Sequence, residues 1–348
     1  MQEFLREVMG IPLSIGVLWQ CIQEAAVAAV PLEDKLVEDL MDDVLRRHES
    51  QANALITEGE PAADAETTEP GAGETVHKEV EASSLTEPQP SVSPHPPLLT
   101  DGVLHIDESP WKQKDEVLWL WVFITRYTVC YWITRRTREL IDNVLPADFD
   151  GWIMSDGYQV YRSFHNRLRC WPHLMRKTRG LIESLDSDGR AFGLSVHQLM
   201  EDMRNDILEW RKTYPDRRTQ TDELAKKYVN RLDGFRRQCH VLAQSEHGKT
   251  ASLAKEFLND WDTLFRVLSY PWLPLSNNEA ERALRHWVLL RRMSHGTKSD
   301  TGSRSLALLA SVIDTCRLRS SSPLDYLSSV IQAARSGTAL PSLPSRGD

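Results

Sequence analysis

Two aspartates each follow an apolar run of the kind that forms a buried β-strand. The run GVLHIDESPW carries Asp107 and Glu108 at its end, and the run GWIMSDGYQVY reaches Asp156 at a glycine turn. If the two strands are parallel neighbours, both aspartates lie at one edge of the sheet, where α/β folds place their sites. Carboxylates held close together raise each other's pKa, which a cation such as Mg²⁺ relieves. Because acids at strand ends are also common in loops, neither aspartate alone defines a site.

A third acid comes from the segment PLSNNEAERALRHWVLLRR, which is typical of a helix start. Ser276 and Glu279 match the capping-box pattern, so Glu279 has a structural explanation. Glu281 borders the apolar face of this helix, which a sheet would cover, and is then directed toward the strand ends. The plainer alternative is an exposed pair with Arg285, worth about 0.2–0.5 kcal/mol. The apolar face consists of Ala280, Leu284, Trp287 and Val288.

Basic residues follow the second and the third acid. Both groups would flank the site, where contacts to nucleic-acid phosphates are needed, although a solvated basic helix face is the alternative. The first group is Arg162, Arg167, Arg169, Arg176, Lys177 and Arg179, and the second is Arg282, Arg285, Arg291, Arg292 and Lys298.

Glu108, Tyr158 and Tyr161 flank the two aspartates. Glu108 points away from Asp107 if the strand continues, so Asp107 is the favoured ligand. The two tyrosines could stack on a DNA end or hydrogen-bond to it. Aromatic residues at this spacing pack a core about as often, and both interpretations stay open.

Two further pairs could support the site. Cys170 and His173 have the CxxH spacing of zinc ligands, but zinc needs two further ligands, and buried packing is preferred for Cys170. Asn277 and Asn278 are expected to shape the turn into the last helix. Contact of these asparagines with metal-bound water or DNA is the less favoured alternative.

The net charge of −9 comes largely from one segment and does not exclude a nucleic-acid partner. Residues 49–100 hold ten acidic side chains and one basic side chain, whereas residues 101–348 hold 36 basic and 31 acidic side chains. The part of the chain that is predicted to fold is therefore mildly basic.

Cysteine usage and hydropathy indicate a cytoplasmic chain. The five widely spaced cysteines, without a CxxC pair, favour a reduced cytosolic protein over a disulfide scaffold. The stretch VMGIPLSIGVLWQCIQEAAVAAVP partly resembles a signal peptide, but Gln20, Gln23 and Glu24 interrupt it, and an amphipathic helix explains it equally well. No segment approaches the roughly 18 apolar residues that a membrane span needs.

Composition and periodicity divide the chain into six segments. The central segments alternate strands and helices around an all-helical insertion, which predicts an α/β fold with a mixed sheet flanked by helices. Helices in the insertion are predicted over residues 196–210, 221–243 and 253–268. The segments are a helical region 1–48 with the stripe Leu32, Leu36, Leu40 and Val44, an acidic Pro/Glu/Thr-rich disordered linker 49–100, the first part of the sheet domain 101–180, the insertion 181–272, the last part of the sheet domain 273–320, and a C-terminal helix with a frayed tail 321–348.

Four ordered blocks resemble signature blocks of the insertion-sequence-66 (IS66) family of DDE transposases. They are HIDESPWK, MSDGYQVYRSF, RCWPHLMRKTRG, and NNEAERALR with the trailing GSRSLALLASVIDTC. The resemblance implies a ribonuclease-H-like fold in which Asp107, Asp156 and Glu281 form the catalytic triad, with the helical insertion before the last acid. It also implies DNA cleavage and strand transfer with two Mg²⁺ or Mn²⁺ ions, bridged by Asp107 and held separately by Asp156 and Glu281.

The resemblance also implies partners. The expected partners are DNA at the element ends and at the target, a second copy of the chain, since two ends react, and accessory proteins of the same element. Family members typically have more chain upstream, so this sequence is interpreted as truncated at its N-terminus, and Ser109 and Pro172 replace the more usual threonine and alanine. The alternatives are an inactive or domesticated remnant that only binds DNA, and a stand-alone metal nuclease.

Overall fold

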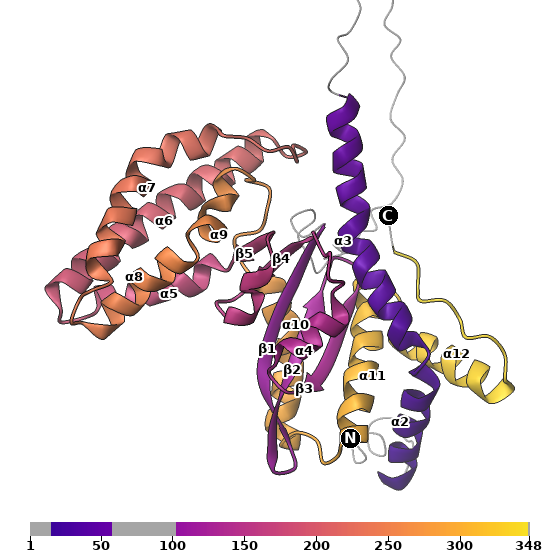
Figure 1. The fold of residues 1–348 in the computed structure, drawn as a ribbon. Coiled ribbons are helices and arrows are strands. Elements are labelled where there is room, and N and C mark those ends of the chain that lie inside the picture. Colours follow the sequence, from indigo (N-terminus) through magenta and orange to yellow (C-terminus); the bar gives the residue numbers. More distant parts are fainter. Residues whose placement is uncertain (1–14, 58–101, 347–348) are drawn as a thin grey trace, which may run out of the picture.

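The computed structural model describes residues 15–57 and 102–346 of the chain. At its centre lies a five-stranded mixed sheet in the order β3-β2-β1-β4-β5. Helices flank this sheet, and a second, all-helical body stands beside it (Figure 1). The predicted α/β fold is therefore confirmed. The strands are β1 Val103–Gln113, β2 Glu116–Ile124, β3 Val129–Thr134, β4 Trp152–Ser155 and β5 Arg167–Arg169.

The central strand, β1, is paired differently on its two sides. β2 pairs with it antiparallel as far as Gln113, whereas β4 pairs with it in parallel only from Val103 to His105. Continuing the parallel register brings Asp107 level with Asp156, just past the end of β4. β1 and β4 are thus parallel neighbours, which is the condition under which both aspartates were expected at one edge of the sheet.

The sequence predicts that β1 ends at Asp107 and Glu108, but the strand is longer. It continues to Gln113 and turns into β2 through Lys114, which has a left-handed φ of 51°. Trp111 stabilises this extension because its side chain is 1% exposed and packs in one core cluster with Leu120. Asp107 thus sits within a long, rigid strand.

Helices supply the remaining elements of the described chain. The α-helices are α2 Ile15–Ala29, α3 Leu32–Thr57, α4 Arg138–Val144, α5 Trp171–Ile182, α6 Ser187–Thr213, α7 Glu223–Leu242, α8 Gly248–Asn259, α9 Trp261–Phe265, α10 Asn278–Ser294, α11 Asp300–Leu318 and α12 Pro323–Ser336. Two short 3₁₀ helices are η1 Gln159–Ser163 and η2 Arg266–Leu268.

Different helices cover the two faces of the sheet. On one face, Leu284 of α10 packs in a cluster with Trp111 and Val122. On the other face, Leu40 of α3 packs in a cluster with Ile106 and with residues of α4, α11 and α12. The sheet is therefore enclosed, which explains why β2 is apolar on both faces. The predicted stripe of α3, Leu32, Leu36, Leu40 and Val44, is buried in full.

α11 also satisfies the open edge of the sheet at β3. The backbone N–H of Tyr131 donates to Ser311 Oγ at 2.8 Å, and that of Val129 donates to Thr315 Oγ1 at 3.1 Å. Thr315 Oγ1 in turn donates to the carbonyl of Val129. Two hydroxyls one helical turn apart thus occupy backbone groups that would otherwise offer a pairing site for another strand.

The all-helical body is formed by α6, α7, α8 and α9, and α5 joins it to the sheet (Figure 1). An aromatic cluster fills its centre, where Phe235 lies 5.0 Å from Phe257 and 5.5 Å from Trp261 between ring centroids. The same core continues to Leu168 of β5 and Met154 of β4. The body is therefore packed against the sheet edge that carries Asp156.

The helix predicted over residues 253–268 is interrupted at Asp260, which is a correction to the sequence prediction. α8 ends at Asn259 and α9 begins at Trp261. Asp260 is 2% exposed, and its carboxylate lies 2.6 Å from Arg167 Nη2 and 3.0 Å from Arg169 Nε. The break lets this buried acid meet two buried arginines of β5.

Both ends of the described chain pack on the sheet domain. α3 continues past residue 48 to Thr57, and residues 58–100 of the predicted linker lie outside the described residues. The described part of the C-terminal tail, up to residue 346, is not frayed, because Leu343 is buried and Arg346 Nε lies 2.8 Å from Asp43 Oδ1. Among the helices of residues 15–57 and 102–346, none has the length and apolar character needed to span a membrane.

We expect Asp260→Ala to lower the free energy of unfolding by about 3–5 kcal/mol, because it leaves Arg167 and Arg169 buried without this counter-ion. Urea unfolding measures the change. Glu209→Ala is the matched control, since it removes an exposed pair with Lys212 and should cost less than about 1 kcal/mol. Equal losses in the two variants would contradict the role given to Asp260.

Candidate active site

Asp107 and Asp156 project from neighbouring strands where their parallel pairing ends. Asp107 is half-buried on the α10 side of β1, and its Oδ1 accepts the backbone N–H of Glu108 at 2.9 Å. Asp156 directly follows β4, and its Oδ1 accepts the backbone N–H of Tyr158 at 2.8 Å. Short backbone contacts therefore orient both carboxylates.

Glu281 reaches the same region from the first turn of α10, but the predicted capping box does not form. The N-cap residue is Asn277 and not Ser276, and its side chain makes no cap hydrogen bond. Glu279 pairs with Arg282 instead of reaching back to the cap. The physical reason is that the side chain of Asn277 is fully buried and is hydrogen-bonded to the sheet.

Asn277 fixes the start of α10 to the central strand. Its Nδ2 donates to the carbonyl of Ile106 at 2.9 Å, and its Oδ1 lies 3.1 Å from His105 Nδ1. Since Oδ1 is an acceptor, Nδ1 of His105 carries the proton, and burial lowers the pKa of His105 to about 4, so the ring is neutral. The carbonyl of Asn277 accepts the N–H of Glu281, which ties Glu281 to β1 through one residue.

Asp107 is a carboxylate without a basic partner among the described residues. Burial raises its pKa to about 8, with further contributions from the negative charges of Asp156, Glu108 and Glu281, while the hydrogen bond from the N–H of Glu108 opposes them. A group of carboxylates with this excess of negative charge fits a hard divalent cation such as Mg²⁺.

Glu108 points to the opposite face, where its charge is compensated. Its side chain is 1% exposed and accepts from Arg136 Nη2 at 2.5 Å and from the Tyr161 hydroxyl at 2.9 Å. The Arg136 guanidinium lies over the rings of Trp119 and Tyr158. Glu108 is thus engaged within the chain, and Tyr161, which is fully buried, packs the core and cannot stack on a DNA end. The core interpretation of Tyr161 is the correct one.

The loop of Asp156 rests on the side chain of Arg169. Because this side chain is buried and paired within the chain, the predicted contact of Arg169 with DNA is wrong. The Arg169 side chain is 1% exposed and pairs with Glu256 and Asp260. A Cβ at Gly157 would lie 2.6 Å from the Arg169 guanidinium, which explains the glycine after Asp156. Arg169 therefore packs against the loop that positions Asp156, one of the predicted catalytic acids.

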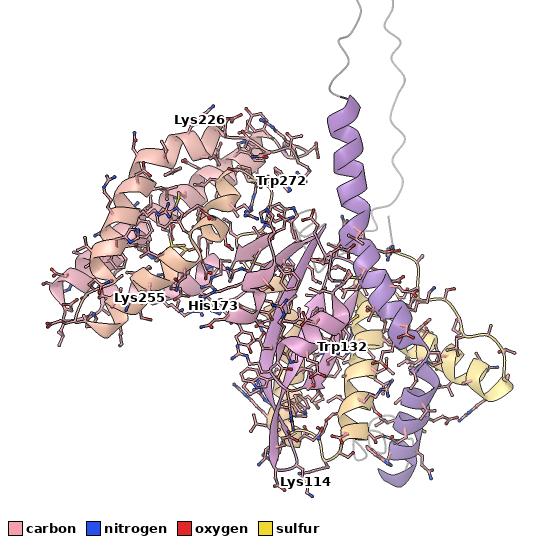
Figure 2. The ribbon with its side chains drawn as sticks, in the orientation of Figure 1. Lys114, Trp132, His173, Lys226, Lys255 and Trp272 are labelled. Carbon is pink, nitrogen blue, oxygen red and sulfur yellow. The ribbon has the colours of Figure 1, made fainter. Side chains whose placement is uncertain are left out.

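The three predicted catalytic carboxylates do not form one tight cluster. Within the described residues, the group of three whose ligand atoms all lie within 4.8 Å of one another is Cys170, His173 and Glu281. A site with two cations needs two of its carboxylates on opposite sides of the third, up to roughly 8 Å apart, so it does not require such a cluster. His173 stands at the junction of the helical body and the sheet (Figure 2).

A basic cavity of about 640 Å³ opens beside this site, and we call it the arginine cavity. Asn278 and His105 also line it, and Glu201 and Glu279 pair there with Arg204 and Arg282. The arginines of the cavity are Arg176, Arg179, Arg204, Arg211 and Arg282. Excess positive charge at this position suits phosphate.

Two arginines of the cavity were not predicted from the sequence. Arg204 and Arg211 belong to α6, far from the acids along the chain, yet with Leu208 they form one stripe at helical spacing. This helical spacing is the sequence pattern that could have identified them as residues of one surface. Arg176 and Arg179 are exposed and have no ion-pair partner among the described residues, which leaves them available to a ligand.

The other predicted basic residues divide into two kinds. Four are engaged within the chain: Arg162 and the buried Arg167 lie 3.7 Å and 2.6 Å from Asp260, Lys177 pairs with Glu256 at 2.6 Å, and Arg291 donates to Ser109 Oγ at 3.0 Å. The rest are exposed along and after α10, namely Arg285, Arg292 and Lys298.

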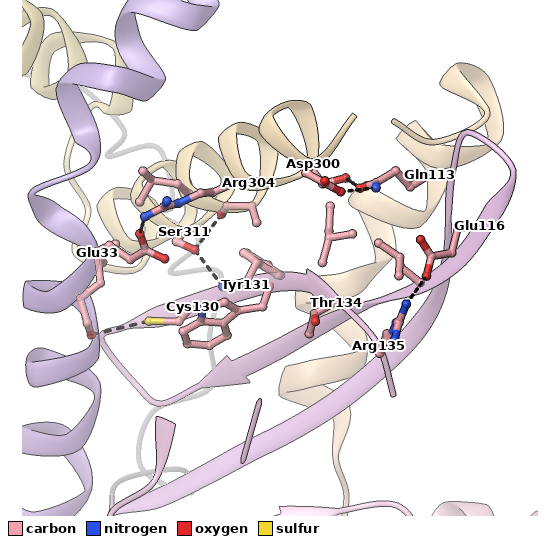
Figure 3. A pocket seen from close by; sticks show the side chains of 17 residues that line it. Glu33, Gln113, Glu116, Cys130, Tyr131, Thr134, Arg135, Asp300, Arg304 and Ser311 are labelled. Atoms are coloured by element: carbon pink, nitrogen blue, oxygen red, sulfur yellow. Dashed lines mark hydrogen bonds and ion pairs between the residues drawn. The ribbon is translucent and has the colours of Figure 1, made fainter. Parts of the chain in front are cut away.

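A second cavity, of about 530 Å³, lies between α3, α11 and β3 (Figure 3). Its polar side chains bind one another, as in the 2.6 Å hydrogen bond from Gln113 to Asp300 and the 2.7 Å pair of Arg304 with Glu33. None of the predicted catalytic residues lines it. We therefore assign a structural role to the residues that line this cavity.

The sequence matches known proteins over the sheet domain and the helical body. The family described as Transposase IS66 family matches residues 94–305. The chain is 23% identical over 212 residues to the uncharacterized protein y4qI of Sinorhizobium fredii, and the aligned part covers 55% of this chain and 37% of that protein. The match thus spans less than half the length of this relative. No solved structure matches the chain.

The raised pKa of Asp107 predicts a pH dependence of stability. The carboxyl ionises near pH 3.8 in the unfolded chain and near pH 8 in the folded chain, so the folded chain binds more protons in between and its stability falls as pH rises through this window. We expect Asp107→Asn to raise the free energy of unfolding by about 1–3 kcal/mol near neutral pH in metal-free buffer, and the gain to shrink toward pH 4.

Urea unfolding at several pH values measures this gain. Glu108→Gln is the matched control, because it removes the charge that Arg136 compensates and should destabilise the protein. Destabilisation by Asp107→Asn near neutral pH would contradict an uncompensated carboxylate.

Proposed function

Since this chain belongs to the IS66 transposase family, we propose that it cleaves insertion-sequence DNA and joins it to a target at a site formed by Asp107, Asp156 and Glu281. The observation that carries the proposal is the position of Asp107 and Asp156 where the parallel pairing of β1 with β4 ends, with no basic partner for Asp107 among the described residues. We extend the proposal to the fold, because three antiparallel strands followed by two parallel ones suit a ribonuclease-H-like arrangement.

In this proposal the three carboxylates have different positions around the cations. Asp107 would be the shared ligand, and Asp156 and Glu281 would each complete one side. When bound, two Mg²⁺ or Mn²⁺ ions supply an activated water or 3′-hydroxyl and stabilise the leaving oxygen. The chain contributes positioning: backbone N–H groups orient the two aspartates, and Asn277 sets the start of the helix that carries Glu281.

The arginine cavity would receive the DNA backbone. Its five arginines outnumber its two glutamates, and it opens next to the first turn of α10, where Glu281 lies. Arginine contacts to phosphate position a duplex without reading its sequence. The exposed Arg285 and Arg292 would extend this basic surface along the helix.

Two other functions fit the same residues in part. A stand-alone metal nuclease would cleave DNA but not join it, and an inactive remnant would bind DNA but not cleave it. The acidic surroundings of Asp107 favour an active site over a remnant. A homodimer and accessory proteins of the same element are further proposals, since the joining of two DNA ends needs more than one site.

We expect Glu281→Gln to slow Mg²⁺-dependent cleavage and strand transfer by at least about 100-fold, the loss typical of removing one charge-stabilising group from an active site. The assay uses DNA that carries the ends of the element encoding this chain. Glu139→Gln is the matched control, because Glu139 is an exposed acid in the first turn of another helix, α4, and should leave the rate unchanged.

Full activity of Glu281→Gln would contradict the proposed triad. Cleavage without joining by the wild type would favour the nuclease, and DNA binding without cleavage would favour the remnant.

We expect Arg179→Ala to weaken DNA binding equally for unrelated sequences and to reduce the slope of log K against log salt by about 1, since one phosphate contact is lost. Fluorescence anisotropy with a labelled duplex over a range of salt concentrations measures both quantities. The control is Arg231→Ala, an arginine of α7 that pairs with Asp202 and does not line the arginine cavity. Identical slopes for the two variants would rule out a phosphate contact at Arg179.

A further inference from the structure

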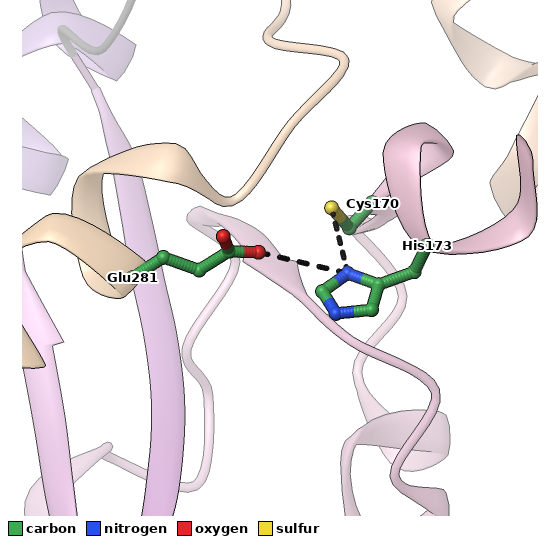
Figure 4. Close-up of side chains that lie close together, drawn as sticks. All are labelled: Cys170, His173 and Glu281. Atoms are coloured by element: carbon green, nitrogen blue, oxygen red, sulfur yellow. Dashed lines mark hydrogen bonds and ion pairs between the residues drawn. The ribbon is translucent and has the colours of Figure 1, made fainter. Parts of the chain in front are cut away.

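One thiol, one imidazole and one carboxylate meet at the start of α5. Cys170 directly precedes this helix, His173 lies in its first turn, and Glu281 lies in the first turn of α10. Nδ1 of His173 is 3.2 Å from Cys170 Sγ and 3.7 Å from Glu281 Oε1 (Figure 4). We propose that these three side chains bind Zn²⁺, and that bound zinc withdraws Glu281 from the carboxylate site.

Two of the three distances between the ligand atoms are close to those of a tetrahedral zinc site, and the third, from Cys170 Sγ to the Glu281 carboxylate, is within 4.8 Å. With Zn–S of about 2.3 Å and Zn–N or Zn–O of about 2.0–2.1 Å, tetrahedral angles place sulfur about 3.5 Å from nitrogen and nitrogen about 3.3 Å from oxygen. The observed separations of 3.2 and 3.7 Å differ from these values by less than about 0.5 Å. Small side-chain rotations close the site around an ion.

Burial raises the pKa of the Cys170 thiol, so the metal-free side chain is a thiol, but two contacts favour the thiolate that a bound metal ion would require. Its Sγ accepts the backbone N–H of Asn277 at 3.4 Å, a hydrogen bond that stabilises negative charge on sulfur. It also lies at the N-terminal end of α5, where the helix dipole favours an anion. A zinc ion would displace the thiol proton and leave this anchored sulfur as its ligand.

The other two ligands leave a route for the ion. Cys170 is fully buried, but the side chains of His173 and Glu281 are 35% and 37% exposed. An ion can therefore enter from the side of the imidazole and the carboxylate. Water from the same side can fill the fourth position that three protein ligands leave open.

The ligand types select zinc over magnesium. Thiolate and imidazole are ligands of zinc, whereas Mg²⁺ requires oxygen. Glu281 belongs to both sites, so a carboxylate that zinc holds beside Cys170 and His173 is not available to the cations of Asp107. This inhibitory consequence rests on the proposed function, whereas zinc binding itself does not.

Cobalt(II) is the probe for the site, because its thiolate complexes absorb strongly in the near ultraviolet. The full chain, reduced and freed of metal by a chelator, is titrated with Co²⁺. We expect this absorption to saturate at one Co²⁺ per chain and to disappear when Zn²⁺ displaces the cobalt. Cys170→Ser should abolish it, whereas Cys239→Ser, which changes another fully buried free thiol, should keep it.

His173→Asn is a second test variant, in which no folding defect is expected because the changed side chain is partly exposed. It should weaken Co²⁺ binding by more than about 10-fold. Absence of thiolate absorption in the wild type, or unchanged absorption in Cys170→Ser, would overturn the zinc site.

The same variants in the cleavage assay separate the zinc site from the proposed function. Zn²⁺ should inhibit Mg²⁺-dependent cleavage by the wild type, and Cys170→Ser should need at least about 10-fold more zinc for the same inhibition. Thiolate-dependent binding with no inhibition would overturn the link to Glu281. A chain that binds Co²⁺ through Cys170 but never cleaves DNA would keep the zinc site and contradict the proposed function.

Discussion

The buried side chain of Asn277 is the contact on which the geometry of the site depends. Its backbone N–H, its carbonyl and both side-chain polar groups are all hydrogen-bonded, to Cys170, Glu281, Ile106 and His105. Because a buried polar group without a partner is costly, these bonds hold α10, β1 and the start of α5 in one arrangement. The start of the helix that carries Glu281 is therefore fixed to the strand that carries Asp107, although the two acids are distant in sequence.

Asp107 and Glu108 show how one strand gives two neighbouring acids opposite roles. Alternation places them on opposite faces of β1. Glu108 meets Arg136 and Tyr161, so its charge is compensated inside the fold. Asp107 is buried without a basic partner among the described residues, and burial, together with the negative charges of Asp156, Glu108 and Glu281, raises its pKa to about 8. Such an arrangement lowers stability and is typical of residues retained for chemistry.

The parts of this structure that the sequence predicted depend on local patterns. Strand periodicity and the apolar stripe of α3 are encoded within a few residues. The acid after each of two apolar runs indicated a shared sheet edge on the condition that β1 and β4 pair in parallel, as they do. Arg169 and Arg176 are indistinguishable by such patterns. Of the two, only Arg169 is buried, and it pairs with Glu256, which is 87 residues away. The expected cap at Ser276 does not form, and Asn277 is instead hydrogen-bonded to a histidine 172 residues away. These outcomes depend on tertiary contacts, which a single sequence does not reveal.

Whether Asp107, Asp156 and Glu281 hold divalent cations together is measured most directly by anomalous diffraction from crystals containing Mn²⁺. We expect anomalous peaks about 2.0–2.5 Å from the carboxylate oxygens of Asp107, with Asp156 and Glu281 as further ligands. The peaks should be absent from crystals of Asp107→Asn. Manganese bound elsewhere, with the carboxylate of Asp107 uncoordinated in the wild type, would contradict the assignment of this site.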